Sequence, residues 1–386
     1  MSQAIKVGVL YSTEGAYSAI SRDCWDGAHI GVAHGLARLS SPIDLQIVSA
    51  NPGADLSLYL SNAQAMLRDH GCRHIIGTVT SAARKEIIPL VEKHDALLWY
   101  VCPYEGFEAN ESVIYMGPCP NQHLLPLLDY AMPRFGGRAY LVGANYVWGW
   151  EMNRLARQLI DDCSGEIVGE RYLPMDETDV DRLIAEIRTR APDFILNNLV
   201  GPSSHAFLRA YRRLGEEDAR FHPSSRPVVS CNLTECELSA IGPSVMEGNF
   251  SIASYFARLD TAENRAFRSA ISTHLESPRS PSAPLATAYT TARLVVDAIA
   301  ATGTDEPSTV RKFITSRSFS TALGQLAIDG RTNHASLPFH VGRISSDESF
   351  DIVMSSLPIA ADPYLAHPQG KNASRPGQER HLRIVP

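Results

Sequence analysis

The chain has 386 residues, a formal net charge of −7 and an isoelectric point of about 6.0. At about 150 residues per domain, this length predicts two or three units with sizeable cores. No run of basic residues marks the sequence, which argues against direct binding to nucleic acid. No stretch of about 18 apolar residues occurs, so the sequence predicts no transmembrane helix.

The N-terminus and the cysteines indicate a cellular compartment. Residues 1–6 lead directly into an apolar strand and lack the basic region and apolar core of a secretory signal. The seven cysteines are odd in number, scattered and without a Cys-x-x-Cys pair, which is typical of reduced thiols. We therefore expect a cytoplasmic protein, with a periplasmic location as the alternative if a signal peptide was removed.

The first part of the sequence alternates apolar strands with helices. This order predicts an α/β fold with a doubly wound, mainly parallel sheet and right-handed crossovers. The expected strands are residues 7–12, 43–48, 74–79, 97–101 and 113–116, and the expected helices run to about residue 36 and over 56–70 and 81–94.

A second alternating series begins near Pro118. It is followed by three helices without strands of their own, and then by short strands. The expected strands are 139–144, 167–173, 194–200, 228–231, 248–256, 323–328, 337–344 and 350–354, and the expected helices are 150–163, 180–190, 203–214, 261–274, 283–302 and 307–315.

Two series of similar size predict two lobes, and the three late helices are expected to return to the first of them. Lobe 1 is predicted from residues 1–120 with 255–322, and lobe 2 from 121–254 with 323–355. Residues 356–386 are rich in Pro, Gly, Asn, Gln and Arg, so we expect an extended tail there and assign it no element.

The most informative segment is residues 97–122, which holds two short apolar strands that end in Gly/Pro-rich turns. The first turn, residues 103–107, carries two aromatic residues, Tyr104 and Phe107. Small ligands bind at the carboxyl ends of the strands in open α/β sheets. The segment therefore predicts a binding site for a small molecule.

Motifs that would indicate catalysis are absent from the sequence. There is no Gly-x-Gly-x-x-Gly, Walker loop, Gly-x-Ser-x-Gly elbow or His-Glu-x-x-His. No nucleophile–base pair can be named, so we expect no enzyme and no catalytic residue. The histidines are scattered, and we expect neither a metal ion nor a cofactor.

Ser81 lies at the junction of an expected strand and helix. Its hydroxyl and the first free N–H groups of that helix could bind a carbonyl or carboxylate oxygen. The alternative is a simple N-cap, and both roles can hold together. Aromatic residues repeat at other strand ends, where buried Tyr and Trp bring a polar group to an apolar wall; they include Tyr100, Tyr104, Tyr146 and Trp148.

On these residues the sequence resembles the type I periplasmic-binding-protein superfamily. Within it, the sequence is most similar to the branch that includes amide sensors of amidase operons and urea-binding proteins of ABC importers. The matching stretches lie in order between residue 5 and about residue 345, and include GTVTSAARKEIIPLVE at 77–92, PYEGFE at 103–108, YMGPCPNQ at 115–122, LVGANY at 141–146 and NLVGPSS at 198–204.

The resemblance implies two lobes joined by three crossings that close on a small polar molecule. It implies that Ser81 hydrogen-bonds the ligand and that Tyr100 and Tyr146 line the pocket. At three positions the residue here is less polar than in the amide sensors, which implies a less polar pocket. Those three are Val79, Cys102 and Trp148, and the remaining expected ligand-binding residues are Tyr104, Val200 and Gly201.

The sequence favours a cytoplasmic sensor that closes on a short amide, urea or related neutral ligand. Such a sensor would regulate amidase-type gene expression through a protein partner, an RNA-binding antiterminator. The alternative is the solute-binding component of an ABC importer for urea, short amides or branched-chain amino acids. The sequence leaves open whether two copies of the chain form a homodimer.

Overall fold

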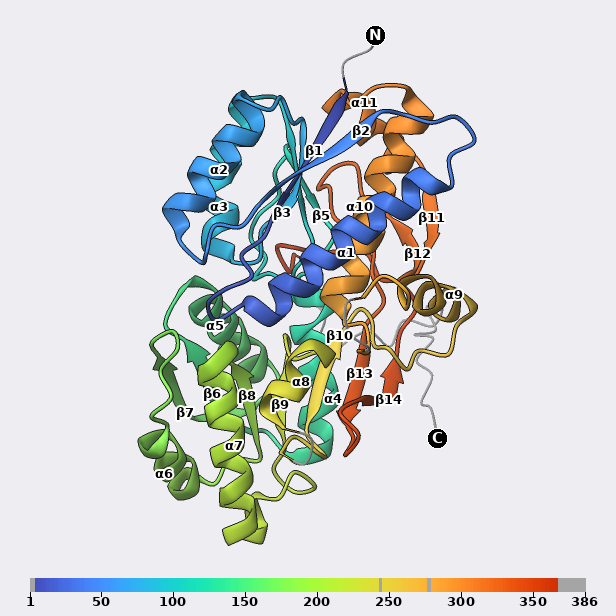
Figure 1. Ribbon diagram of the computed structural model, residues 1–386. Helices are drawn as coiled ribbons and strands as arrows, with labels where there is room; N and C mark the ends of the chain where they lie inside the picture. Colours follow the sequence, from blue (N-terminus) through green and yellow to red (C-terminus); the bar gives the residue numbers. More distant parts are fainter. Residues whose placement is uncertain (1–3, 243–244, 276–278, 367–386) are drawn as a thin grey trace. The chain divides into compact units, whose positions relative to one another are not determined.

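The computed structural model describes residues 4–242, 245–275 and 279–366 of the chain. Two compact units are formed, each from segments that are distant in the sequence (Figure 1). Within the described residues, unit 1 comprises Met1–Tyr104, Glu108–Pro118 and Asp260–Leu337. Unit 2 comprises Glu105–Phe107, Cys119–Leu259 and the chain from Pro338 onward.

Unit 1 is built on a parallel five-stranded sheet in the order β2-β1-β3-β4-β5. The order reverses between β1 and β3, so the sheet is doubly wound, as predicted. The strands are β1 (Ile5–Leu10), β2 (Leu45–Ala50), β3 (His74–Gly77), β4 (Leu97–Tyr100) and β5 (Val113–Tyr115).

Helices cover both faces of this sheet, with α2 and α3 on one face and α1 and α10 on the other (Figure 1). A small antiparallel hairpin follows the last helix. The helices are α1 (Ser18–Ala37), α2 (Leu56–Arg68), α3 (Ser81–Lys93), α9 (Ala262–Ile271), α10 (Ala283–Thr302) and α11 (Pro307–Thr315), and the hairpin strands are β11 (Ser318–Thr321) and β12 (Gly324–Ala327).

Helices α1 and α10 approach each other unusually closely. Gly27, Gly31 and Gly35 are spaced four residues apart, so they lie on one face of α1. A Cβ atom at Gly31 would lie 2.5 Å from the carbonyl oxygen of Tyr289 in α10. Glycine is therefore required there by the backbone of the neighbouring helix.

Unit 2 is built on a seven-stranded sheet in the order β14-β13-β10-β9-β8-β6-β7. All neighbours are parallel except β13, which is antiparallel to both β10 and β14. The strands are β6 (Arg138–Ala144), β7 (Glu166–Leu173), β8 (Phe194–Asn198), β9 (Val228–Ser230), β10 (Phe250–Ala253), β13 (His340–Ile344) and β14 (Phe350–Ser355).

In unit 2, α4 packs on α5, and α7 packs on both α6 and α8. Two of these helices, α4 and α8, are absent from the sequence-based assignment. Helix α4 contains two prolines, one in its first turn and one near its end, which mask its helical pattern. The helices are α4 (Leu124–Phe135), α5 (Val147–Asp162), α6 (Asp181–Arg190), α7 (Gly201–Glu217) and α8 (Glu235–Ile241), with short 3₁₀ turns η1 (Pro120–Gln122) and η2 (Ala219–Phe221).

The boundaries of the units differ from the predicted lobes at residues 119–120 and 255–259, which were expected in lobe 1 and belong to unit 2, and over a longer stretch at residues 323–337. Residues 323–337 were expected in lobe 2, whereas in the structure they belong to unit 1. The reason is that Asn333 and Ala335 hydrogen-bond the backbone of Tyr115 in β5, on either side of a short bridge at His334. A turn that contains Glu105–Phe107 belongs to unit 2, although the chain on both sides of it belongs to unit 1.

The beginning of the expected tail is ordered on unit 2. Asn121 donates to the carbonyl of Ala360 at 2.9 Å and accepts from the N–H of Asp362 at 2.9 Å. Gln122 donates to the carbonyl of Ile359 at 3.0 Å. The Pro-Asn-Gln motif therefore fixes residues 359–362, and the tail beyond residue 366 lies outside the described residues. Among the described helices, none is long and apolar enough to span a membrane.

Candidate functional site

The carboxyl edge of the unit 1 sheet gathers five of the residues expected to bind a ligand. Strands β3 and β4 are parallel neighbours, so the turns that follow them lie at one edge of the sheet. The turn after β3 carries Val79 and Ser81, and the end of β4 with the turn after it carries Tyr100, Cys102 and Tyr104. All five side chains are buried.

Ser81 is the first residue of α3 rather than its N-cap. The side chain of Thr80 accepts a hydrogen bond from the N–H of Ala83 at 3.1 Å and so caps the helix. The N-cap alternative for Ser81 is therefore wrong. The Ser81 hydroxyl instead faces Arg84, whose Nη1 lies 3.4 Å from Oγ, because residues three apart share a helix face.

Arg84 is the centre of a polar network that the sequence analysis did not identify. Its side chain is fully buried, and its guanidinium lies 4.6 Å from the ring centre of Tyr100 and 4.9 Å from that of Tyr104. Its Nε donates to Oε1 of Glu108 at 2.9 Å, with Nη2 3.4 Å from Oε2. The buried cation is therefore paired with a carboxylate inside unit 1.

Glu108 collects further partners from the same unit. Lys85 donates to its Oε2 at 3.0 Å and Tyr115 donates to its Oε1 at 2.8 Å. Burial alone would raise the pKa of Glu108, but the charge of Arg84, its hydrogen bond and Lys85 outweigh burial and lower the pKa. Glu108 is consequently held as a carboxylate.

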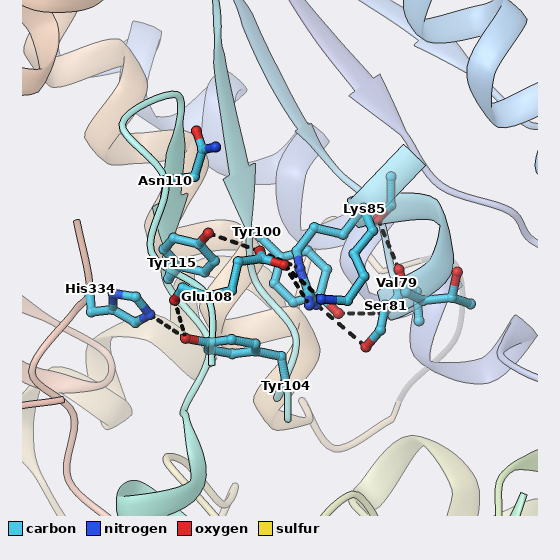
Figure 2. A network of polar contacts seen from close by, with 12 residues as sticks. Val79, Ser81, Lys85, Tyr100, Tyr104, Glu108, Asn110, Tyr115 and His334 are labelled. Atoms are coloured by element: carbon cyan, nitrogen blue, oxygen red, sulfur yellow. Dashed lines mark hydrogen bonds and ion pairs between the residues drawn. The ribbon is translucent and has the colours of Figure 1, made fainter. Parts of the chain in front are cut away.

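His334 joins the network from the return segment of the chain. Its Nε2 lies in hydrogen-bond contact with the hydroxyl of Tyr104, and its ring stacks on Tyr115 with centres 4.1 Å apart. Burial lowers the pKa of His334 to about 4, so the ring is neutral at pH 7. Figure 2 shows how the network connects the beginning of α3 to the turn after β4.

The carboxyl edge of the unit 2 sheet holds the other four expected residues. Strands β6 and β8 are parallel neighbours, and Tyr146 and Val200 are the N-cap residues of the helices that follow them, α5 and α7. Gly201 opens α7 with φ +53°, a left-handed value that favours glycine. Trp148, expected at a strand end before the helix, lies in the first turn of α5.

Trp148 carries a polar group that the protein does not use. Its side chain is 4% exposed, and its Nε1 is buried without a hydrogen-bond partner in the described part of the chain. An indole N–H left unpaired in this way is destabilising unless something else accepts its hydrogen. Taken together, the nine residues expected to bind a ligand lie at two sheet edges, one in each unit. That all nine contact one ligand stays a prediction.

The polar groups at these two sheet edges are suited to binding a small ligand. No group of three or more His, Cys, Asp or Glu side chains that could hold a metal ion occurs among the described residues. Cys102 and Cys231 are buried, and burial raises the pKa of Cys231 well above its ordinary value. Hydroxyl, indole and backbone N–H groups at helix beginnings can hold a small polar ligand.

Comparison with known families identifies this fold. The model of the periplasmic binding protein domain family matches residues 5–369, and the chain belongs to that family. The expected α/β fold of type I periplasmic binding proteins is confirmed. The fold is one of ligand-binding proteins.

Solved structures of ABC transporter proteins share the fold at low sequence identity. A solute-binding protein from Rhodopseudomonas palustris HaA2, in complex with p-hydroxybenzoic acid, is 19% identical, with a TM-score of 0.81 over 91% of this chain and 95% of that one. One from R. palustris in complex with benzoate is 17% identical, with a TM-score of 0.81 over 93% and 98%.

A branched-chain amino acid ABC transporter ligand-binding protein from Burkholderia xenovorans LB400 is 18% identical, with a TM-score of 0.77 over 92% of this chain and 96% of that one. Among curated proteins, a limonene hydroxylase from Geobacillus stearothermophilus is 27% identical over 128 residues. That stretch is 33% of this chain and only 23% of the hydroxylase. These similarities do not assign the chain to the amide- and urea-binding branch or to any other branch of the family.

Proposed function

We propose that this chain is the solute-binding component of an ABC importer and that its ligand is a small neutral polar molecule. The family match and the ABC transporter proteins of the same fold support the importer role. The ligand class rests on one observation, the pairing of Arg84 with Glu108 beside Ser81. Because the buried cation already has its counter-ion, a ligand at Ser81 needs no charge of its own.

The expected ligand is a short amide, a urea or a related compound with an apolar substituent. Its oxygen would accept from the Ser81 hydroxyl and from N–H groups at the beginning of α3. The side chains of Val79 and Cys102 would provide an apolar surface. In unit 2, the unpaired Nε1 of Trp148 is a further donor that would suit a carbonyl oxygen.

A carboxylate is the second candidate ligand. Lys85 adds a positive charge next to Glu108, and the beginning of a helix favours an anion. The solved R. palustris proteins bind benzoate or p-hydroxybenzoic acid, which supports this class by analogy of fold alone. Lys85 is 43% exposed, so water screens its charge, and the neutral ligand is preferred.

A thermal-shift panel tests the ligand class. Purified protein is heated with butyramide, urea, benzoate, 4-hydroxybenzoate or leucine, because a ligand at 100 times its Kd stabilises the folded state by about 2.7 kcal/mol. We expect butyramide-like amides or urea to raise the melting temperature. Stabilisation by leucine or benzoates, with no response to any amide or urea, would assign the chain to the carboxylate class instead.

Calorimetry on Ser81→Ala tests the assigned contact. Removing the hydroxyl should weaken binding of the active compound by about 5- to 10-fold, since one hydrogen bond contributes roughly 1 kcal/mol. Thr80→Ser is the matched control, because it keeps the cap of α3 and should leave affinity unchanged. Equal affinity of Ser81→Ala and wild type would remove Ser81 from the site.

The cytoplasmic sensor favoured by the sequence remains the second functional proposal. It is less well supported, because the solved proteins of this fold described above belong to ABC transporters. Fractionation of cells that express the native gene separates the two roles. A periplasmic protein would support the importer, whereas a cytoplasmic one that co-purifies with an antiterminator in a ligand-dependent way would support the sensor.

A further inference from the structure

Tyr11 carries a buried hydroxyl that the protein leaves unpaired. Tyr11 directly follows β1, is 0% exposed, and its hydroxyl has no hydrogen-bond partner in the described part of the chain. Buried polar groups are nearly always hydrogen-bonded, because desolvation without a partner is unfavourable. An orphan hydroxyl in a buried position therefore calls for an explanation.

The position of Tyr11 is at the carboxyl edge already described in unit 1. Strand β1 lies next to β3, with Leu10 opposite Gly77. A Cβ atom at Gly77 would lie 2.6 Å from the carbonyl oxygen of Leu10, so the two strand ends are in close contact. Tyr11 is thus adjacent to the turn that carries Val79 and Ser81.

The groups around Tyr11 are other phenols and thiols of the same edge. Burial raises the pKa of Tyr11 well above its ordinary value, and Cys24, Cys102, Tyr100 and Tyr59 lie near enough to raise it further. None of these four groups is a cation that would take the hydroxyl as a partner. Tyr11 is therefore a neutral phenol that can both donate and accept a hydrogen bond.

The two neighbouring tyrosines show what is different about Tyr11. The hydroxyl of Tyr59 accepts from the backbone N–H of Ser12 at 3.1 Å. The hydroxyl of Tyr100 donates to the carbonyl of Val79 at 2.7 Å. Both hydroxyls are engaged by the protein backbone, whereas the hydroxyl of Tyr11 keeps its full hydrogen-bonding capacity.

We infer that Tyr11 is a specificity-determining residue whose hydroxyl hydrogen-bonds a polar atom of the bound ligand. This inference rests on the proposed function, because it requires a ligand at the unit 1 edge. A buried polar group that is satisfied only by the ligand discriminates strongly against analogues that lack the matching atom. Tyr11 would therefore select ligands with a second polar atom besides the oxygen held at Ser81.

The substitution Tyr11→Phe tests the inference, because it removes the hydroxyl and keeps the ring. Calorimetry uses the panel compound that most stabilises the wild-type protein. We expect the Kd for that compound to rise by about tenfold or more. The unfolding midpoint of the ligand-free variant should not fall, since the lost hydroxyl had no partner within the protein.

Tyr140→Phe is the matched control. Tyr140 lies within β6 of unit 2, and its hydroxyl is buried beside Glu186. This variant should bind the same compound with unchanged affinity. A Tyr11→Met variant, which also keeps an apolar side chain, repeats the measurement should Tyr11→Phe not fold.

The outcomes separate this inference from the proposed function. If the wild-type protein responds to a panel compound and Tyr11→Phe binds it equally well, the inference is overturned and the proposed function stands. The inference is also overturned if Tyr11→Phe is less stable than the wild-type protein without ligand but binds the compound with unchanged affinity. That result would mean that the Tyr11 hydroxyl hydrogen-bonds a buried water. No response of the wild-type protein to any panel compound overturns both.

Discussion

At the scale of single residues, Glu108 has the greatest influence on the candidate site. It is the counter-ion of a fully buried arginine and also accepts from Tyr115. Removing one partner of a buried ion pair leaves the other charge uncompensated, which is more destabilising than the pair was stabilising. The beginning of α3, where Ser81 lies, depends on this pairing through Arg84.

Replacing Glu108 by Gln should lower the free energy of unfolding by about 3–5 kcal/mol, the range for breaking a buried pair. Lys85→Gln is the control, because Lys85 contacts the same carboxylate but is 43% exposed. This substitution should lower the free energy of unfolding by less than about 1 kcal/mol. Urea unfolding at pH 7 measures both. Similar effects of the two substitutions would show that the Arg84 contact is not the dominant one.

At the scale of elements, the contact between α1 and α10 holds unit 1 together. Both helices are 20 residues long, and α10 is buried over most of its surface. The glycines on one face of α1 allow the backbones to meet, so their role is close approach rather than flexibility. Intrinsic helix propensity alone would favour alanine at each of these positions.

We predict that Gly31→Ala destabilises the protein by about 1–3 kcal/mol, because the added methyl group would overlap the carbonyl of Tyr289. At Ala33, an exposed position of the same helix, propensity alone acts, and Ala33→Gly should cost about 1 kcal/mol. Thermal unfolding followed by circular dichroism compares them. A Gly31→Ala protein as stable as wild type would contradict the close approach.

At the scale of the whole molecule, three buried histidines make stability depend on pH. Burial lowers the pKa of His74, His334 and His340 to about 4, from an ordinary value of 6.5. The unfolded chain therefore binds more protons than the folded one between these values. Stability contributed by the neutral histidines is complete above pH 6.5 and is lost as the pH falls towards 4.

Urea unfolding at pH 7, 5.5 and 4.5 should accordingly show a falling free energy of unfolding, with up to about 3 kcal/mol from each histidine. The pKa of Asp23, which burial raises, has the opposite effect, so variants are decisive. As the pH is lowered, the free energy of unfolding of His340→Asn should fall less steeply than that of the wild-type protein. His70→Asn, at an exposed position, should show the same slope as the wild-type protein. Identical slopes for all three proteins would refute the assignment.

Much of the unit 1 edge could be predicted from the sequence. The order of strands and helices follows from local apolar patterns and from turn residues, which act within a few positions. Parallel neighbouring strands then place the residues after them at one edge, which is why Ser81, Tyr100 and Tyr104 could be expected to lie close together there. Helix α4 was missed for an equally local reason, since its prolines argue against a helix.

By itself, then, the sequence determined the parallel α/β class, the order of the elements and the edge where a ligand is expected. Only the tertiary structure decided that His334 stacks on Tyr115, that residues 323–337 belong to unit 1 and that Asn121 holds the chain near Ala360. It also decided which buried hydroxyls, such as that of Tyr11, remain unpaired. The physical reason is that these contacts join segments up to more than 200 positions apart, whereas a sequence pattern carries information only about neighbours along the chain.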